Sequence, residues 1–84
     1  MLYSAQIRAA RALLDWKQSE LAKAAKIGLA TIQRLEKGHG LVNAHVSTVV
    51  QIQTTLEKAG VRFFGPDEQG GVGVRLKRNA ARSS

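Results

Sequence analysis

The polar side chains between residues 29 and 37 have the types and spacing needed to bind nucleic-acid bases. If LATIQRLEK is helical, Ile32 and Leu35 share one side, and Gln33, Arg34 and Lys37 occupy the opposite side. Arginine can donate two hydrogen bonds to guanine and glutamine can pair with adenine, while alanine and threonine methyls can contact thymine. One helix fits the major groove of B-DNA. The alternative is an ordinary solvated helix face.

Catalytic and metal-binding patterns are not evident in the sequence. The chain has no cysteine and only two histidines, His39 and His45, neither of which is close in sequence to a cluster of acids. The six acidic residues are scattered and form no general acid/base pair. The glycines at positions 70, 71 and 73 lack the strand-then-helix context of a phosphate loop. We therefore expect no enzyme activity, no metal and no cofactor.

Size and charge favour one small domain that binds a polyanion. The chain has 84 residues and a formal net charge of +7, which attracts nucleic acid or an anionic membrane surface. No apolar run approaches the roughly 20 residues of a membrane span. The N-terminal residues lack the basic start and continuous apolar block of a signal peptide. We expect a cytoplasmic protein without a membrane partner.

Apolar periodicity predicts four helices that would position these side chains. Their expected ranges are 4–14, 18–25, 29–37 and 44–59. Ser4, Gly28 and Asn43 are the expected N-caps of the first, third and fourth helices, and Gly38 is expected to end the third helix in the left-handed conformation. In the last range the stripe Val46, Val49, Ile52, Leu56 and Ala59 indicates a helix, although many of its residues are β-branched. Trp16 is expected to fill the core between helices.

The sequence changes character after Gly60. VRFF at 61–64 and VGVRL at 72–76 flank the turn-rich GPDEQGG and predict a β-hairpin. A two-stranded hairpin is marginal alone in water, so its apolar face needs either the helical body or a second copy. Both arrangements remain open. We divide the chain into a helical domain at 1–60, the hairpin at 61–76 and a mobile basic tail at 77–84, which either adds phosphate contacts or is simply solvated.

The stretch QSELAKAAKIGLATIQRLEKG, preceded by IRAARALLDW, resembles the lambda-repressor-like (Cro/XRE-type) helix-turn-helix family. The resemblance implies a mainly α fold, a bundle of four or five helices that binds double-stranded DNA through its third helix; the C-terminal hairpin lies outside the family pattern. By position it implies base contacts from Leu29, Ala30, Thr31, Gln33 and Arg34, backbone contacts from Gln18 and Lys37, and a buried salt bridge between Arg11 and Glu36. Lys17 and His39 are further expected backbone contacts.

The sequence departs from the family pattern in three respects. Lys26 stands where relatives commonly have a left-handed glycine, a conformation that costs a lysine about 1–2 kcal/mol; otherwise the turn has another shape. Lys17 replaces the usual Ser or Thr cap and sets a cation against the helix dipole. Leu29 and Ala30 are apolar, so hydrogen-bonded readout rests on Gln33 and Arg34, which predicts a modest sequence preference.

The resemblance implies a transcriptional regulator, and we expect a repressor that acts as a homodimer on half-sites roughly 34 Å apart. The residues expected to form the dimer are Val61, Phe63, Val72, Val74 and Leu76 of the hairpin. One alternative is an antitoxin-type module that binds a protein toxin and also its own operator. Another is a scaffold that never touches DNA.

Overall fold

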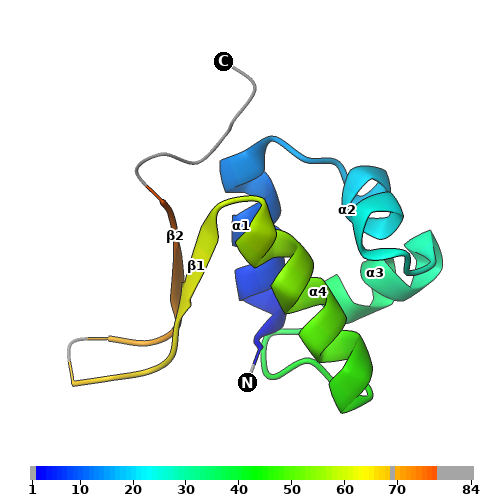
Figure 1. Ribbon diagram of the computed structural model, residues 1–84. Coiled ribbons are helices and arrows are strands. Elements are labelled where there is room, and N and C mark those ends of the chain that lie inside the picture. Colours follow the sequence, from blue (N-terminus) through cyan, green and yellow to red (C-terminus); the bar gives the residue numbers. More distant parts are fainter. Residues whose placement is uncertain (1, 69, 78–84) are drawn as a thin grey trace.

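The computed structural model describes residues 2–68 and 70–77. It contains four helices followed by a two-stranded antiparallel sheet (Figure 1). The elements are α1 (Ser4–Leu14), α2 (Gln18–Ala25), α3 (Leu29–Glu36), α4 (Val46–Lys58), β1 (Val61–Phe64) and β2 (Gly73–Leu76). The predicted mainly α fold with a C-terminal hairpin is therefore confirmed. Apart from Lys77, the expected basic tail lies outside the described residues.

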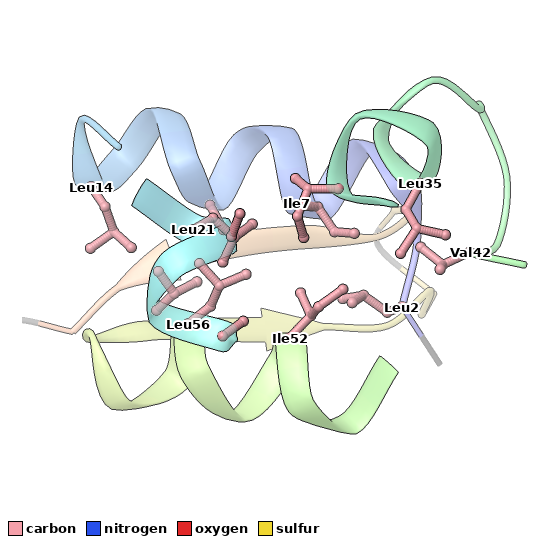
Figure 2. Packing of buried hydrophobic residues seen from close by; sticks show 13 residues of the cluster. Leu2, Ile7, Leu14, Leu21, Leu35, Val42, Ile52 and Leu56 are labelled. Carbon is pink, nitrogen blue, oxygen red and sulfur yellow. The ribbon is translucent and has the colours of Figure 1, made fainter. Parts of the chain in front are cut away.

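Each helix contributes its apolar stripe to one core. Ile7 of α1, Leu21 of α2, Ile32 of α3 and Ile52 and Leu56 of α4 are fully buried and belong to a single cluster. Figure 2 shows side chains of α1 and α4 pointing toward each other across this cluster. Burying each such side chain stabilises the fold by about 1.5–3 kcal/mol. Trp16 is partly buried and packs against the core, as expected.

None of the described helices is long and apolar enough to cross a membrane.

The first two helices end in the same type of turn. Asp15 after α1 and Lys26 after α2 adopt the left-handed conformation, with φ of 57° and 58°. The backbone N–H of Ile27 donates to the carbonyl of Ala22 at 3.0 Å, and Trp16 N–H donates to Arg11 at 2.9 Å. These bonds are those of a Schellman motif. Lys26 therefore makes the family's turn without glycine, at a conformational cost of about 1–2 kcal/mol.

The start of α1 and the end of α3 differ from the expected positions. Ser4 is the first helical residue rather than the N-cap, because Tyr3 holds that position and its N–H donates to Gln6 Oε1 at 2.9 Å. The hydroxyl of Ser4 instead donates to the carbonyl of Leu35 at 2.6 Å. The third helix ends at Glu36, and Gly38 is not left-handed. A Cβ at Gly38 would lie 3.3 Å from Ser4 Oγ, so glycine permits α1 and this loop to approach closely.

The fourth helix starts later than expected. It begins at Val46, with His45 rather than Asn43 as the N-cap. The preceding segment is held away from helical conformation because Val42 N–H donates to the Leu2 carbonyl at 2.8 Å and Leu41 forms a bridge with Tyr3. Val46 is 78% exposed and does not join the apolar stripe.

The hairpin packs on the helices of its own chain. Val61 pairs with Leu76 and Phe63 with Val74, and these four side chains contact the core. β2 starts at Gly73, one residue later than predicted. The sheet lies against α1 and α4, so the hairpin folds back over α4, as one of the two alternatives proposed, and also over α1.

A buried glutamine fastens the hairpin to α1. Gln6 Nε2 donates to the carbonyls of Phe64 at 3.0 Å and Gly73 at 3.1 Å, one on each strand. Its Oε1 accepts the bond from Tyr3, so both ends of this amide are used within the fold. The hairpin is thus held to the helical body by polar as well as apolar contacts.

Candidate nucleic-acid interface

The third helix is anchored on one side and open on the other. Ile32 and Leu35 are buried in the core, while Ala30, Gln33 and Arg34 are exposed. Leu29 is also exposed, and Thr31 is half-buried at the margin. The eight-residue helix is too short to be stable alone in water, so its conformation depends on this packing. The body therefore fixes the direction in which the exposed side chains point.

The expected ion pair between α1 and α3 is present. Arg11 Nε donates to Glu36 Oε2 at 2.7 Å, and Nη2 donates to Oε1 at 2.8 Å. The Glu36 side chain is only 4% exposed. Its Oε1 also accepts a bond from Gln18 Nε2 at 3.1 Å, and Arg11 Nη1 donates to the Trp16 carbonyl at 2.9 Å. Hydrogen bonding to Glu36 raises the pKa of Arg11, so the guanidinium stays charged.

A second arginine of α1 holds the same end of α3. Arg8 Nη1 donates to the main-chain carbonyl of Glu36 and, at 3.0 Å, to that of Gly38. Carbonyls at a helix C-terminus lack partners within the helix and carry the negative end of its dipole, so a guanidinium is well suited to them. This role of Arg8 was not predicted. The position of Arg8 on the polar side of α1 gave no signal that distinguishes a solvated side chain from one that reaches another helix.

The three helices surround an open, basic hollow of about 530 Å³. Its walls come from α1, from the start of α2 and from the outward side of α3 through Lys37. The lining residues are Arg8, Arg11, Gln18, Ala30, Gln33, Arg34, Glu36 and Lys37. Four of these are cations and one is an acid that already pairs with Arg11. The hollow therefore offers positive charge and hydrogen-bond donors beside the exposed helix face.

Of the expected backbone-contact residues, Gln18 and Lys37 line the hollow, whereas Lys17 and His39 do not. Lys17, Lys37 and His39 are exposed. Lys17 N–H donates to Glu20 Oε1 at 2.8 Å, so Glu20 supplies a hydrogen-bond partner at the helix end where the usual cap is missing. Gln18 is half-buried and its amide is bonded to Glu36, which makes it part of the framework as well as the hollow.

The five apolar hairpin residues lie away from this surface. Four of them contact the core of their own chain, and the fifth is half-buried just before β2: Val61, Phe63, Val74 and Leu76, and then Val72.

Among the described residues, no group of three His, Asp or Glu side chains is placed so that it could hold a metal ion.

Comparison with known proteins identifies the arrangement of α1 to α4. A family model described as helix-turn-helix matches residues 7–58, more than half of the chain. This range runs from within α1 to the end of α4 and stops before the hairpin. No match to the chain was found among curated proteins.

Proposed function

The chain belongs to the lambda-repressor-like helix-turn-helix family of DNA-binding transcription regulators, and on that premise we propose that it is a cytoplasmic, sequence-specific repressor acting as a homodimer. The observation that carries the proposal is the outward face of α3. Gln33 and Arg34 are exposed on it, while Glu36 at the end of the same helix is buried and held by Arg11. A helix clamped in this way presents its polar side chains at a fixed angle.

Base readout is assigned to the middle of α3. Arg34 can donate two hydrogen bonds to the O6 and N7 of guanine, and Gln33 can bond the N6 and N7 of adenine. Ala30 and Leu29 are apolar and suit a thymine methyl. Thr31, half-buried, has the hydroxyl and methyl for a contact at the helix margin. With two side chains carrying most of the hydrogen-bonded readout, the sequence preference is modest.

Phosphate contacts are assigned to four residues, of which Gln18 and Lys37 line the hollow and Lys17 and His39 lie next to helix ends. Lys17 and Lys37 lie at the start of α2 and the end of α3, and His39 follows in the loop. Gln18 reaches the hollow from α2. These contacts position the protein on the duplex without selecting its sequence. Neutralising phosphates releases counterions, so affinity falls steeply as salt rises.

The size of the molecule and its exposed apolar residues support the proposed homodimer. The described chain measures 33 × 32 × 19 Å, so two copies side by side can place their α3 helices about one DNA turn, roughly 34 Å, apart. The hairpin's apolar face is used within its own chain. Three apolar residues remain exposed after α3 and on the first turns of α4: Leu41, Val46 and Val50. We assign the contact with the second copy to these three residues. A dimer on the operator would occlude the promoter.

Selection of bound sequences from a random duplex pool tests the proposal. The expected product is a pair of short, inverted half-sites whose centres lie about one helical turn apart, roughly 10 base pairs. Recovery of no enriched sequence would contradict specific readout by α3. Enrichment of a single, unrepeated half-site would leave specific readout intact and contradict the homodimer.

A further inference from the structure

The outer face of the hairpin carries an unusual group of side chains. The strands alternate, so Arg62 and Phe64 of β1 and Arg75 of β2 point away from the helical body. We call these three residues the outer hairpin face. The hairpin lies on the opposite side of the molecule from α3, with α1 and α4 between them (Figure 1). A duplex held by α3 therefore leaves this face open.

The two arginines of this face lie directly opposite each other. Arg62 pairs with Arg75 in the antiparallel register, and like charges in such a pair destabilise a sheet. Both guanidiniums lie near the ring of Phe64, at 5.8 and 5.0 Å from its centre, which offsets part of the repulsion. Among the residues that the structure describes, neither arginine forms an ion pair. The pairing thus costs stability, and no contact within the described chain requires it.

The aromatic ring is also left open. Phe64 is 36% exposed, and its cross-strand partner is Gly73, which has no side chain to cover it. Lys77 follows β2, is exposed, and lines a second hollow together with Arg62 and with Glu57 of α4. The outer hairpin face itself combines an apolar centre, Phe64, with the two arginines beside it.

These features fit a partner that supplies carboxylates and one apolar side chain. A guanidinium stacked on a ring keeps its N–H edge free for a two-pronged bond to a carboxylate. Arginine and aromatic residues are enriched in protein–protein interfaces and among their energetically dominant residues. A second copy of the same face is disfavoured, because it would bring four arginines together.

We propose that the outer hairpin face binds an acidic, extended segment of a partner protein. Carboxylates of the segment bond Arg62 and Arg75, and an apolar side chain between them covers Phe64. The surface is separate from the DNA-contacting face, so the chain can hold a duplex and a protein partner together. This partner goes beyond the proposed repressor function and does not depend on it.

The test uses a short fluorescent peptide rich in Glu with one central Leu, and a matched peptide with Gln for every Glu. The variant carries Arg62→Gln with Arg75→Gln, and the control carries Lys23→Gln with Lys26→Gln, which removes the same charge from the exposed end of α2. Because the variant relieves like-charge repulsion, its stability in urea should equal or exceed that of the wild type, so weaker binding cannot be attributed to unfolding.

The acidic peptide should bind the wild type and the control, shift the amide resonances of residues 61–64 and 73–77, and bind the variant at least about tenfold more weakly. The Gln peptide should bind none of them. Equal loss in variant and control, or no binding of the acidic peptide to the wild type, would overturn the proposal. A matching loss of affinity for single- or double-stranded DNA in the variant would also overturn it, because the face would then be a nucleic-acid contact.

Discussion

Arg11 and Glu36 are joined by two hydrogen bonds, 2.7 Å from Nε and 2.8 Å from Nη2, that tie the last turn of α1 to the last residue of α3. Arg8, one turn earlier on α1, bonds the main-chain carbonyl of the same glutamate. Two arginines therefore hold both the side chain and the backbone at one end of α3. The orientation of this helix on the body is set by α1 as well as by the core.

Substitution of Glu36 by glutamine should destabilise the fold. The change keeps the shape of the side chain but leaves the guanidinium of Arg11 without its charge partner. Because Arg11 is partly exposed, we expect a loss of about 2 kcal/mol, less than for a fully buried pair. Urea denaturation measures the loss. The control is the exposed Glu57→Gln, expected within about 0.5 kcal/mol of the wild type; similar values for both variants would show that the pair is not needed for stability.

Substitution of Lys26 by glycine should stabilise the fold. Glycine adopts the left-handed conformation without the steric cost that lysine incurs, although it also gains freedom in the unfolded chain. The net gain is expected to reach up to about 1 kcal/mol. Lys23→Gly, three residues earlier within α2, should instead cost about 1 kcal/mol. If both glycines destabilised the protein equally, the strain assigned to Lys26 would be absent.

Substitution of Gln6 by glutamate should loosen the hairpin. The new side chain keeps the acceptor for Tyr3 N–H but replaces the Nε2 donor with an oxygen that faces two carbonyls. We expect a loss of about 2 kcal/mol at neutral pH and faster amide exchange in β1 and β2. The loss should shrink as pH falls, because a protonated carboxyl can donate again. Gln53→Glu on α4 is the control, and unchanged exchange in the strands would contradict the role of Gln6.

The elements that local chemistry determines were predictable from sequence, and those set by distant contacts were not. The helical stripes of Ile7, Leu21 and Ile32 are local periodicities, and all three residues are buried as expected. The ends of helices differed where another segment intervenes. The backbone N–H of Val42 donates to the carbonyl of Leu2, so α4 begins only at Val46. No pattern within residues 39–46 predicts that hydrogen bond.

The same distinction applies to the candidate site. The pairing of Arg11 with Glu36 was implied by the family resemblance, because both positions belong to the helix-turn-helix pattern. The bonds of Arg8 to α3 and of Gln6 to the hairpin link residues far apart in sequence. Side-chain type alone does not distinguish them from solvated residues. The hairpin lay outside the pattern, so whether its apolar face met its own helices could be decided only from the structure.

Charge placed on the exposed apolar residues of α4 should disrupt the proposed homodimer. Val46 and Val50 are 78% and 54% exposed and lie one turn apart. We expect the wild type at micromolar concentration to have about twice the 9.1 kDa mass of the chain, and Val46→Glu with Val50→Glu to have the mass of one chain. Light scattering gives both masses. Ala24→Glu, on the exposed side of α2, should remain dimeric, and a wild type with the mass of one chain would contradict a dimer in solution.

The most direct test of α3 as the reading helix compares Arg34→Ala with Lys37→Ala on a selected duplex and on a scrambled one. Each affinity is measured over a range of salt concentrations. We predict that Arg34→Ala weakens binding to the selected duplex by about 1–3 kcal/mol and leaves binding to the scrambled duplex almost unchanged. Lys37→Ala should weaken binding to both duplexes alike. It should also lower by about 1 the slope of log affinity against log salt concentration. If Arg34→Ala weakened binding to both duplexes equally, α3 would not read the bases through this side chain.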